Sequence, residues 1–254
     1  MTTRVMAGKV AEMGAAIGWG ALAASSLVIG AALSFARPWS MRQVGYVLAF
    51  GAGALISAVS FELAAEGIEI GGAAITGIGL GLGAITYYVL DGMIARRHST
   101  GRGRKGRIEG SGSGTALALG AFLDGIPEQL VLGITIAAGE GVGVSLLVAI
   151  FVSNLPEALG SARDMSRTGK PRQTIMRLWL LVAAICVCAS AVGYLAADAV
   201  SGDARAAIDG FAAGALLVML IDSMIPDARK DAGRRAGLVT VLGFAVAAGL
   251  SSLS

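Results

Sequence analysis

The sequence predicts an all-α, polytopic membrane protein, with eight transmembrane helices forming a single transmembrane domain over residues 1–254. Three observations predict it: the composition, eight apolar stretches separated by polar breaks, and a one-sided distribution of basic residues. Of the residues, 55% are apolar and only 15% are charged, whereas soluble domains carry roughly 25% charged residues. This composition excludes a water-soluble globule. Eight spans of about 20 residues each leave no room for a separate soluble domain.

The apolar stretches give the expected helices in order. The first is longer than the apolar region of a signal peptide, which has about 7 to 15 residues, so we expect it to be retained. Arg37-Pro38 ends this first span, and Gly71-Gly72 interrupts the chain near the start of the third. A Gly/Ser/Arg-rich segment, expected to be a flexible cytoplasmic loop, covers residues 96–114. The spans are expected at about residues 12–35, 44–65, 68–95, 115–138, 142–162, 178–197, 206–225 and 236–253.

The basic residues predict the orientation. Of the 20 lysines and arginines, 17 lie in the first, third, fifth and seventh connections, which the positive-inside rule assigns to the cytoplasm. We therefore expect a multi-pass protein of the inner (cytoplasmic) membrane with both termini outside, and a net charge of +3 that reflects the lipid bilayer rather than a nucleic-acid partner. Arg205 falls on the outer side, where Glu66 and Glu69 are expected on a solvated face.

Two stretches of the sequence repeat in opposite orientations. FGAGALISAVSFEL, at Phe50–Leu63, matches FAAGALLVMLIDSM, at Phe211–Met224, although the second and seventh spans run in opposite directions. Ile126-Pro127-Glu128 and Leu155-Pro156-Glu157 echo each other in the fourth and fifth spans. These matches predict an inverted repeat in which spans one to three are related to spans six to eight, a 3+2+3 arrangement. Such repeats are typical of transporters that alternate access around a site near the midplane.

Three carboxylates fall inside the apolar spans. Asp124, Glu128 and Glu157 lie in spans four and five, where each ionised carboxylate costs about 3 kcal/mol. The basic residues are all expected in loops or at span ends, so the sequence offers no internal cation. The negative charges must therefore be removed by protons or balanced by a cation from outside the chain.

Helical spacing groups oxygen donors around these carboxylates. Asp124 and Glu128 are four residues apart, and Ser153 and Asn154 share a helical face with Glu157. The prolines before the two glutamates cannot donate a backbone hydrogen bond, which leaves carbonyls of the preceding turn unpaired. The spacing predicts a cation site between the two helices, with the metal ligands Asp124, Glu128, Ser153, Asn154 and Glu157.

The motifs LDGIPEQL and SNLPEAL resemble those of the ZIP (Zrt/Irt-like) metal transporters, whose fourth span carries H-N-x-P-E-G and whose fifth carries H-E-x-P-H-E or Q-D-x-P-E-G. Eight spans, outside termini and a long basic third loop are also similar to that family. The resemblance implies transport of divalent cations such as Zn²⁺, Mn²⁺ or Fe²⁺, with Glu128 and Glu157 bridging one or two ions. The metal is then the substrate, and no organic cofactor is expected.

This chain departs from the family motifs because every imidazole is missing. Asp124 stands where the family has His, and Ser153 where it has His or Gln, while the single histidine, His98, lies in the third loop. A site built of oxygens suits Mn²⁺, Mg²⁺ or Fe²⁺ better than Zn²⁺, although Zn²⁺ can still bind. Cys186 and Cys188, in the sixth span, are expected to be small packing residues.

Several alternatives stay open at this point. Asp222 and Glu62 are candidates for lining the ion pathway, and a homodimer is the expected assembly. The second functional hypothesis is a proton- or ion-coupled exchanger of another small substrate, in which the carboxylates carry protons. An intramembrane hydrolase is disfavoured, because the spans contain no Ser-His or His-Glu set. The protein is therefore not expected to be an enzyme.

Overall fold

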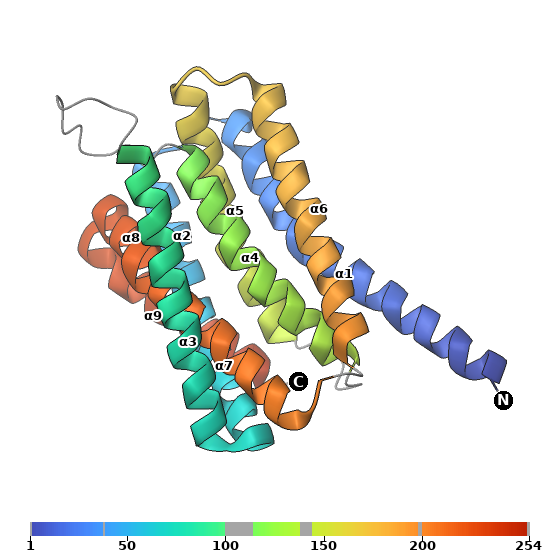
Figure 1. Cartoon of the computed structure of the whole chain (residues 1–254). Helices are drawn as coiled ribbons and strands as arrows, with labels where there is room; N and C mark the ends of the chain where they lie inside the picture. The colour runs from blue at the N-terminus through green and yellow to red at the C-terminus, as the bar shows by residue number, and fades with distance from the viewer. Residues whose placement is uncertain (1, 38, 100–113, 138–143, 198–199, 253–254) are drawn as a thin grey trace.

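A computed structural model describes residues 2–37, 39–99, 114–137, 144–197 and 200–252, and every regular element in these ranges is helical (Figure 1). Two helices continue through short π-helical segments, labelled η1 and η2, and a 3₁₀ turn, η3, precedes the last helix. The elements are α1 (Thr2–Ala36), α2 (Met41–Ala58), η1 (Val59–Ala64), α3 (Ala65–Ser99), α4 (Gly114–Ala137), α5 (Val144–Arg167), α6 (Arg172–Ala197), α7 (Gly202–Met219), η2 (Leu220–Met224), α8 (Ile225–Ala232), η3 (Gly233–Arg235) and α9 (Ala236–Ser251).

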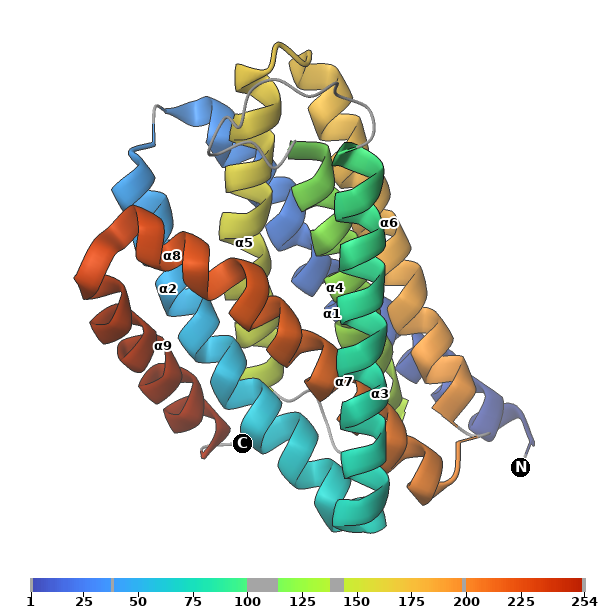
Figure 2. The ribbon, with the colours of Figure 1, turned by 60° about the vertical axis from the view of Figure 1, so that its left-hand side comes forward.

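Four helical stretches are long and apolar enough to cross a membrane: Glu12–Ala36, Met41–Met93, Arg172–Ala197 and Gly202–Ser251. The second and fourth have 53 and 50 residues, whereas a straight helix of about 20 residues already spans the bilayer core. Both long stretches fold back on themselves as helical hairpins (Figure 2). The chain is therefore an all-helical membrane protein.

The first hairpin turns at one of the two breaks that the sequence indicated. The expected spans left a gap at residues 66–67, and Gly71-Gly72 was expected to interrupt the chain near the start of the third span. The structure turns at Gly72, which has φ 81° and ψ 162°. Only glycine adopts this conformation without a steric penalty. Glu66 lies within the helix before this turn, and its carboxylate pairs with Arg205.

A capping box fixes the start of α2. The Ser40 hydroxyl accepts a hydrogen bond from the Gln43 backbone N–H at 3.2 Å, and the Gln43 side chain accepts one from the Ser40 N–H at 3.1 Å. These bonds satisfy two backbone donors that the first turn of a helix leaves unpaired. Helix α2 therefore begins at Met41, three residues before the expected span at 44–65.

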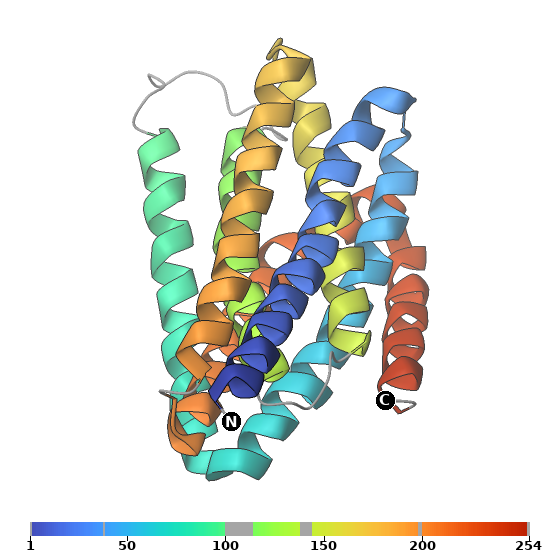
Figure 3. The same ribbon diagram turned by 90° about the vertical axis from the view of Figure 1, so that its right-hand side faces the viewer.

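The helices pack in two groups. One group contains α1, α4, α5 and α6, and the other contains α2, α3, α7, α8 and α9, with α2 packed against α5 between them (Figures 2 and 3). The ends of α1, α3, α5 and α8 lie at one end of the bundle, where the basic connections were expected. The start of α1 and the end of α9 lie at the opposite end (Figure 3).

Glycines bring α3 and α7 into backbone contact. A Cβ atom at Gly83 would lie 1.9 Å from the Phe211 carbonyl oxygen, and one at Gly214 would lie 2.0 Å from the Leu80 carbonyl oxygen. Both distances are far below van der Waals contact. The two helices therefore meet only because these positions have no side chain, as is common among membrane helices.

The contact between α2 and α9 repeats this pattern with the matching residues. A Cβ atom at Gly243 would lie 2.0 Å from the Phe50 carbonyl oxygen, and one at Gly53 would lie 1.8 Å from the Thr240 carbonyl oxygen. Phe50 and Gly53 occupy the same places in their stretch as Phe211 and Gly214 in the matched one.

The two π-helical segments also lie at matching positions. Val59 and Leu220, where η1 and η2 begin, occupy the same place in the two matched stretches. A π turn contains one residue more than an α turn and is frequent at functional sites. The sequence match between Phe50–Leu63 and Phe211–Met224 is thus accompanied by a shared local distortion.

The glycine contacts predict a position-specific effect on stability within α3. Gly83→Leu should push α3 and α7 apart and destabilise the protein by at least the 1–3 kcal/mol or so of an overpacked core. Gly81→Leu, two residues away, should have little effect, since nothing lies within 4 Å of the added Cβ. Melting temperatures of the two variants in detergent test this, and equal melting temperatures would contradict it.

Candidate metal centre

The two Pro-Glu motifs lie in the middle of the first helix group. Pro127 is inside α4 and Pro156 is inside α5, and both helices continue through their prolines. Glu128 is 2% exposed, Ser153 and Asn154 are also buried, and Glu157 is half-buried. Four of the five predicted ligands thus lie in the interior of neighbouring helices.

The fifth predicted ligand, Asp124, belongs to α4, but its side chain lies outside the described residues. In the described part of the chain, no three side chains of the types His, Cys, Asp and Glu lie close enough together to hold a metal ion. The proposed ligand set therefore stays a prediction.

The Glu128 and Glu157 carboxyls interact electrostatically with each other. In the described part of the chain, the ion pairs join Arg205 to Glu66 and to Asp209, and none involves either glutamate. Glu128 Oε2 is buried and forms no hydrogen bond within that part. A buried carboxylate beside a second acidic group needs a proton or a cation, so this pair has the electrostatics of a cation site.

Two helices close over the Pro-Glu motif of α5. A Cβ atom at Gly51 of α2 would lie 3.0 Å from the Val152 carbonyl oxygen and 3.2 Å from Ser153 Cα. On α1, a Cβ atom at Gly30 would lie 2.3 Å from the Leu155 carbonyl oxygen. Val152 precedes Pro156 by four residues, so its carbonyl is the one that loses the usual helical hydrogen bond.

The Ser153 hydroxyl donates a hydrogen bond to the Ile150 carbonyl oxygen at 3.1 Å. This bond uses the hydroxyl proton within α5, and it leaves the lone pairs of the oxygen as acceptors. Ser153 could therefore offer its oxygen to a cation without breaking its bond to the helix, and its role as a ligand stays a prediction.

Helix α6 places one residue, Cys186, beside the first Pro-Glu motif, although the sequence analysis expected it to be a packing residue. Cys186 is fully buried, and its Sγ atom lies 2.8 Å from where a Cβ atom of Gly125 would stand. Ser190, one turn later, donates a hydrogen bond to the Ala16 carbonyl oxygen at 3.0 Å. Helical spacing could have placed Cys186 on the face opposite Cys188, but it does not indicate which helix this face contacts.

The two predicted pathway residues lie in the π-helical segments. Glu62, in η1, accepts a hydrogen bond from the Ser251 hydroxyl of α9 at 2.6 Å. Asp222, in η2, is exposed on the surface of the bundle. The structure thus directs Glu62 towards α9, and a role of either residue in the ion pathway stays a prediction.

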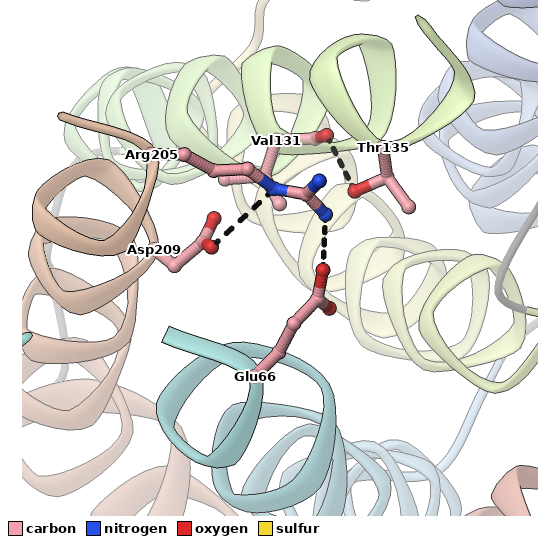
Figure 4. A network of polar contacts seen from close by, with 5 residues as sticks. All are labelled: Glu66, Val131, Thr135, Arg205 and Asp209. Atoms are coloured by element: carbon pink, nitrogen blue, oxygen red, sulfur yellow. Dashed lines mark hydrogen bonds and ion pairs between the residues drawn. The ribbon is translucent and has the colours of Figure 1, made fainter. Parts of the chain in front are cut away.

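Arg205 is largely buried, although all basic residues were expected in loops or at the ends of spans. Its side chain is 12% exposed and pairs with Glu66 of α3 and, at 3.9 Å, with Asp209 one turn along α7 (Figure 4). Val131 and Thr135 of α4 lie beside the guanidinium group. Glu66 is therefore partly buried rather than fully solvated, because Arg205 at the start of α7 reaches its carboxylate from the neighbouring helix.

A cavity of about 270 Å³ opens at the basic end of the bundle, between α2, α5 and α8. Its charged lining residues are Arg163, Asp164, Arg167, Asp227, Lys230 and Asp231. Asp164 lies beyond the fifth expected span. Burial raises the pKa of its carboxyl, although Arg167 and Arg163 act to lower it. Gly160 also lines the cavity and follows Glu157 by one helical turn, so α5 leads from the carboxylate pair to this opening.

Comparison with known proteins assigns the family. The model of the ZIP zinc transporter family matches residues 97–251, which include both Pro-Glu motifs and more than half of the chain. The chain belongs to this family, as its motifs predicted. A protein of Arabidopsis thaliana named "Putative zinc transporter" is 29% identical over 216 residues, an alignment that covers 82% of this chain. The chain spans about a third of the length of that relative, 34% of which is covered.

The buried ion pairs predict that Arg205 is needed for stability. Arg205→Gln leaves the Asp209 carboxylate, which is 2% exposed, without this cation, and breaking such a pair costs about 3 to 5 kcal/mol. The variant should therefore melt at a clearly lower temperature than the parent protein in detergent. Arg177→Gln, at an exposed position of α6, should leave the melting temperature unchanged. If Arg205→Gln has the same melting temperature as the parent protein, the ion pairs of Arg205 have no structural role.

Proposed function

We propose that this protein transports divalent metal cations across the cytoplasmic membrane by alternating access, through a carboxylate site between α4 and α5. The observation that carries the proposal is the Glu128–Glu157 pair, in which two interacting acidic groups have no ion-pair partner in the described part of the chain. Membership of the ZIP zinc transporter family supports it, since the members of this family are transporters rather than enzymes.

The proposed architecture has eight membrane crossings in a 3+2+3 inverted repeat, forming a single transport domain. The mirrored glycine contacts and the matching π-helical segments support the relation between the first and last three crossings. The long hairpins of Figure 2 supply two crossings each. In the membrane, the basic end of the bundle faces the cytoplasm and both termini lie outside, as the positive-inside rule requires.

Transport in this proposal is an elevator-like movement of the group α1, α4, α5 and α6 against the other helices. An almost wholly apolar cavity of about 400 Å³ separates α4 and α6 from α3 and α7, which supports a loosely packed boundary there. The cavity that includes Gly160 and Asp164 provides an opening towards the basic end. The described packing thus leaves room for movement and for release of the ion.

The proposed first ligands are Glu128 and Glu157, joined by Asp124, Ser153 and Asn154, with Glu62 and Asp222 along the pathway. Zn²⁺, Mn²⁺ and Fe²⁺ are the candidate ions, and the name of the plant relative favours zinc among them. The protein is proposed to act in the inner membrane as a homodimer. Lipid and the transported metal are its remaining partners.

Removal of either glutamate tests the carboxylate site. Glu128→Gln and Glu157→Gln should each lower saturable uptake of radioactive Zn²⁺ or Mn²⁺ into proteoliposomes by at least about tenfold, because each removes a charged ligand worth about 1.4 kcal/mol or more. Glu69→Gln, at an exposed position of α3, is the matched control and should transport normally. Proton movement without metal uptake in the parent protein would instead favour the proton-coupled exchanger.

The oxygen-rich ligand set predicts the effect of restoring the motif histidine. Asp124→His should raise the preference for Zn²⁺ over Mn²⁺ by about tenfold, because one hard oxygen is replaced by an imidazole nitrogen. Competition uptake with both ions measures the ratio. The control is Asp203→His, at the exposed start of α7. An unchanged ratio in Asp124→His would mean that Asp124 does not contact the ion.

A further inference from the structure

Cys186 lies directly against the helix that carries the first Pro-Glu motif. Its Sγ atom occupies the space next to Gly125, where a Cβ atom would stand only 2.8 Å away. Among the described residues, Sγ is the only atom of another helix within 4 Å of that position. The thiol therefore points from α6 at the backbone of α4, three residues before Glu128.

The Glu128 carboxyl belongs to the same face of α4 that Cys186 contacts. Gly125 and Glu128 lie on one face of α4, since they are three residues apart. The charge of Glu128 acts on the Cys186 thiol. Glu128 is 2% exposed, and its Oε2 atom has no hydrogen-bond partner within the described residues. A buried acceptor without a partner needs a proton, a water molecule or a cation to satisfy it.

The rest of the surroundings of Cys186 is apolar. It belongs to a buried cluster that includes Ala24, Leu27, Ala158 and Trp179, from α1, α5 and α6. An apolar cluster of this kind suits a cysteine whose only role is packing. The unpartnered carboxylate beside it distinguishes Cys186 from such a packing residue.

We propose that Cys186 is a ligand of the transported cation, binding it through Sγ together with the Glu128 carboxylate. This inference rests on the proposed function and deepens it, because it names the class of ion. Thiolates bind Zn²⁺ and other soft ions such as Cd²⁺ strongly and add little affinity for Mn²⁺ or Mg²⁺. The transporter would therefore prefer thiophilic divalent ions, despite the absence of histidine from its motifs.

Metal binding at this position changes the charge balance of the bundle. The ligand form of cysteine is the thiolate, so binding releases the thiol proton. The dication then neutralises one thiolate and one carboxylate in the interior. No third His, Cys, Asp or Glu side chain of the described residues stands within ligand distance of a shared ion, so the proposed oxygen ligands of other types, Ser153 and Asn154, together with water, complete the coordination shell.

Cys188 provides a matched control. It lies two residues along α6 and is exposed, whereas Cys186 is buried. These are the only two cysteines of the sequence, so Cys188→Ala leaves Cys186 as the single thiol. Any thiol or thiolate signal in that variant comes from Cys186.

The transport test compares ions in proteoliposomes that contain the full-length protein. Cys186→Ser should weaken competition by Cd²⁺ and Zn²⁺ for the uptake site by about tenfold or more, while Mn²⁺ uptake continues, because the hydroxyl replaces a soft ligand by a hard one. Cys188→Ala should behave as the parent protein. Unchanged Cd²⁺ competition in Cys186→Ser would overturn the inference.

A spectroscopic test does not depend on the folding of Cys186→Ser. Cd²⁺ or Co²⁺ added to purified Cys188→Ala should produce the ultraviolet thiolate-to-metal charge-transfer band, and Glu128→Gln should weaken it. Metal uptake without such a band would overturn the role of Cys186 and leave the proposed function standing. If the parent protein transports no divalent metal, the proposed function itself fails.

Discussion

Direct backbone contact between helices, at positions without side chains, is the constraint on which the bundle depends. Lipid does not drive apolar helices together as water does, so their association requires close van der Waals contact. Gly53, Gly83, Gly214 and Gly243 provide it within the second helix group. The same device acts at the site, where α1 and α2 approach the Pro-Glu motif of α5 through Gly30 and Gly51. Packing and site geometry therefore have a common origin in the glycine content of the chain.

The buried acidic residues of the bundle differ in whether a basic side chain compensates their charge. Asp209 has a cation on its own helix, Arg205, which also reaches Glu66 and so connects α7 to α3. Glu128 interacts with Glu157, and no ion pair in the described part of the chain compensates it. Both arrangements are costly to bury. Only the second lacks a cation within the described part of the chain, and for this reason Glu128, rather than Asp209, is the candidate metal ligand.

Hydropathy and charge predicted much of this structure, because a segment that crosses lipid must satisfy its own backbone hydrogen bonds. The all-helical class, the family and the interior position of Glu128 follow from apolar stretches and two short motifs. The burial of Arg205 was not predictable, since its partner Glu66 is 139 residues away. The break at Gly71-Gly72 was predictable from the glycine pair, and the structure places the turn at Gly72. The contact of Cys186 with Gly125 depends on which faces of α4 and α6 meet, and periodicity alone does not contain that information.

The matching positions of η1 and η2 bear on the history of the chain. One residue inserted into an α-helix is accommodated by a single π turn, which widens the helix locally and leaves the flanking turns in register. Two independent insertions at corresponding points of the two matched stretches would be a coincidence. If the proposed inverted repeat arose by gene duplication, a single insertion in the ancestral unit accounts for both segments. The distortion would then be older than the duplicated chain, inherited twice from a smaller membrane polypeptide.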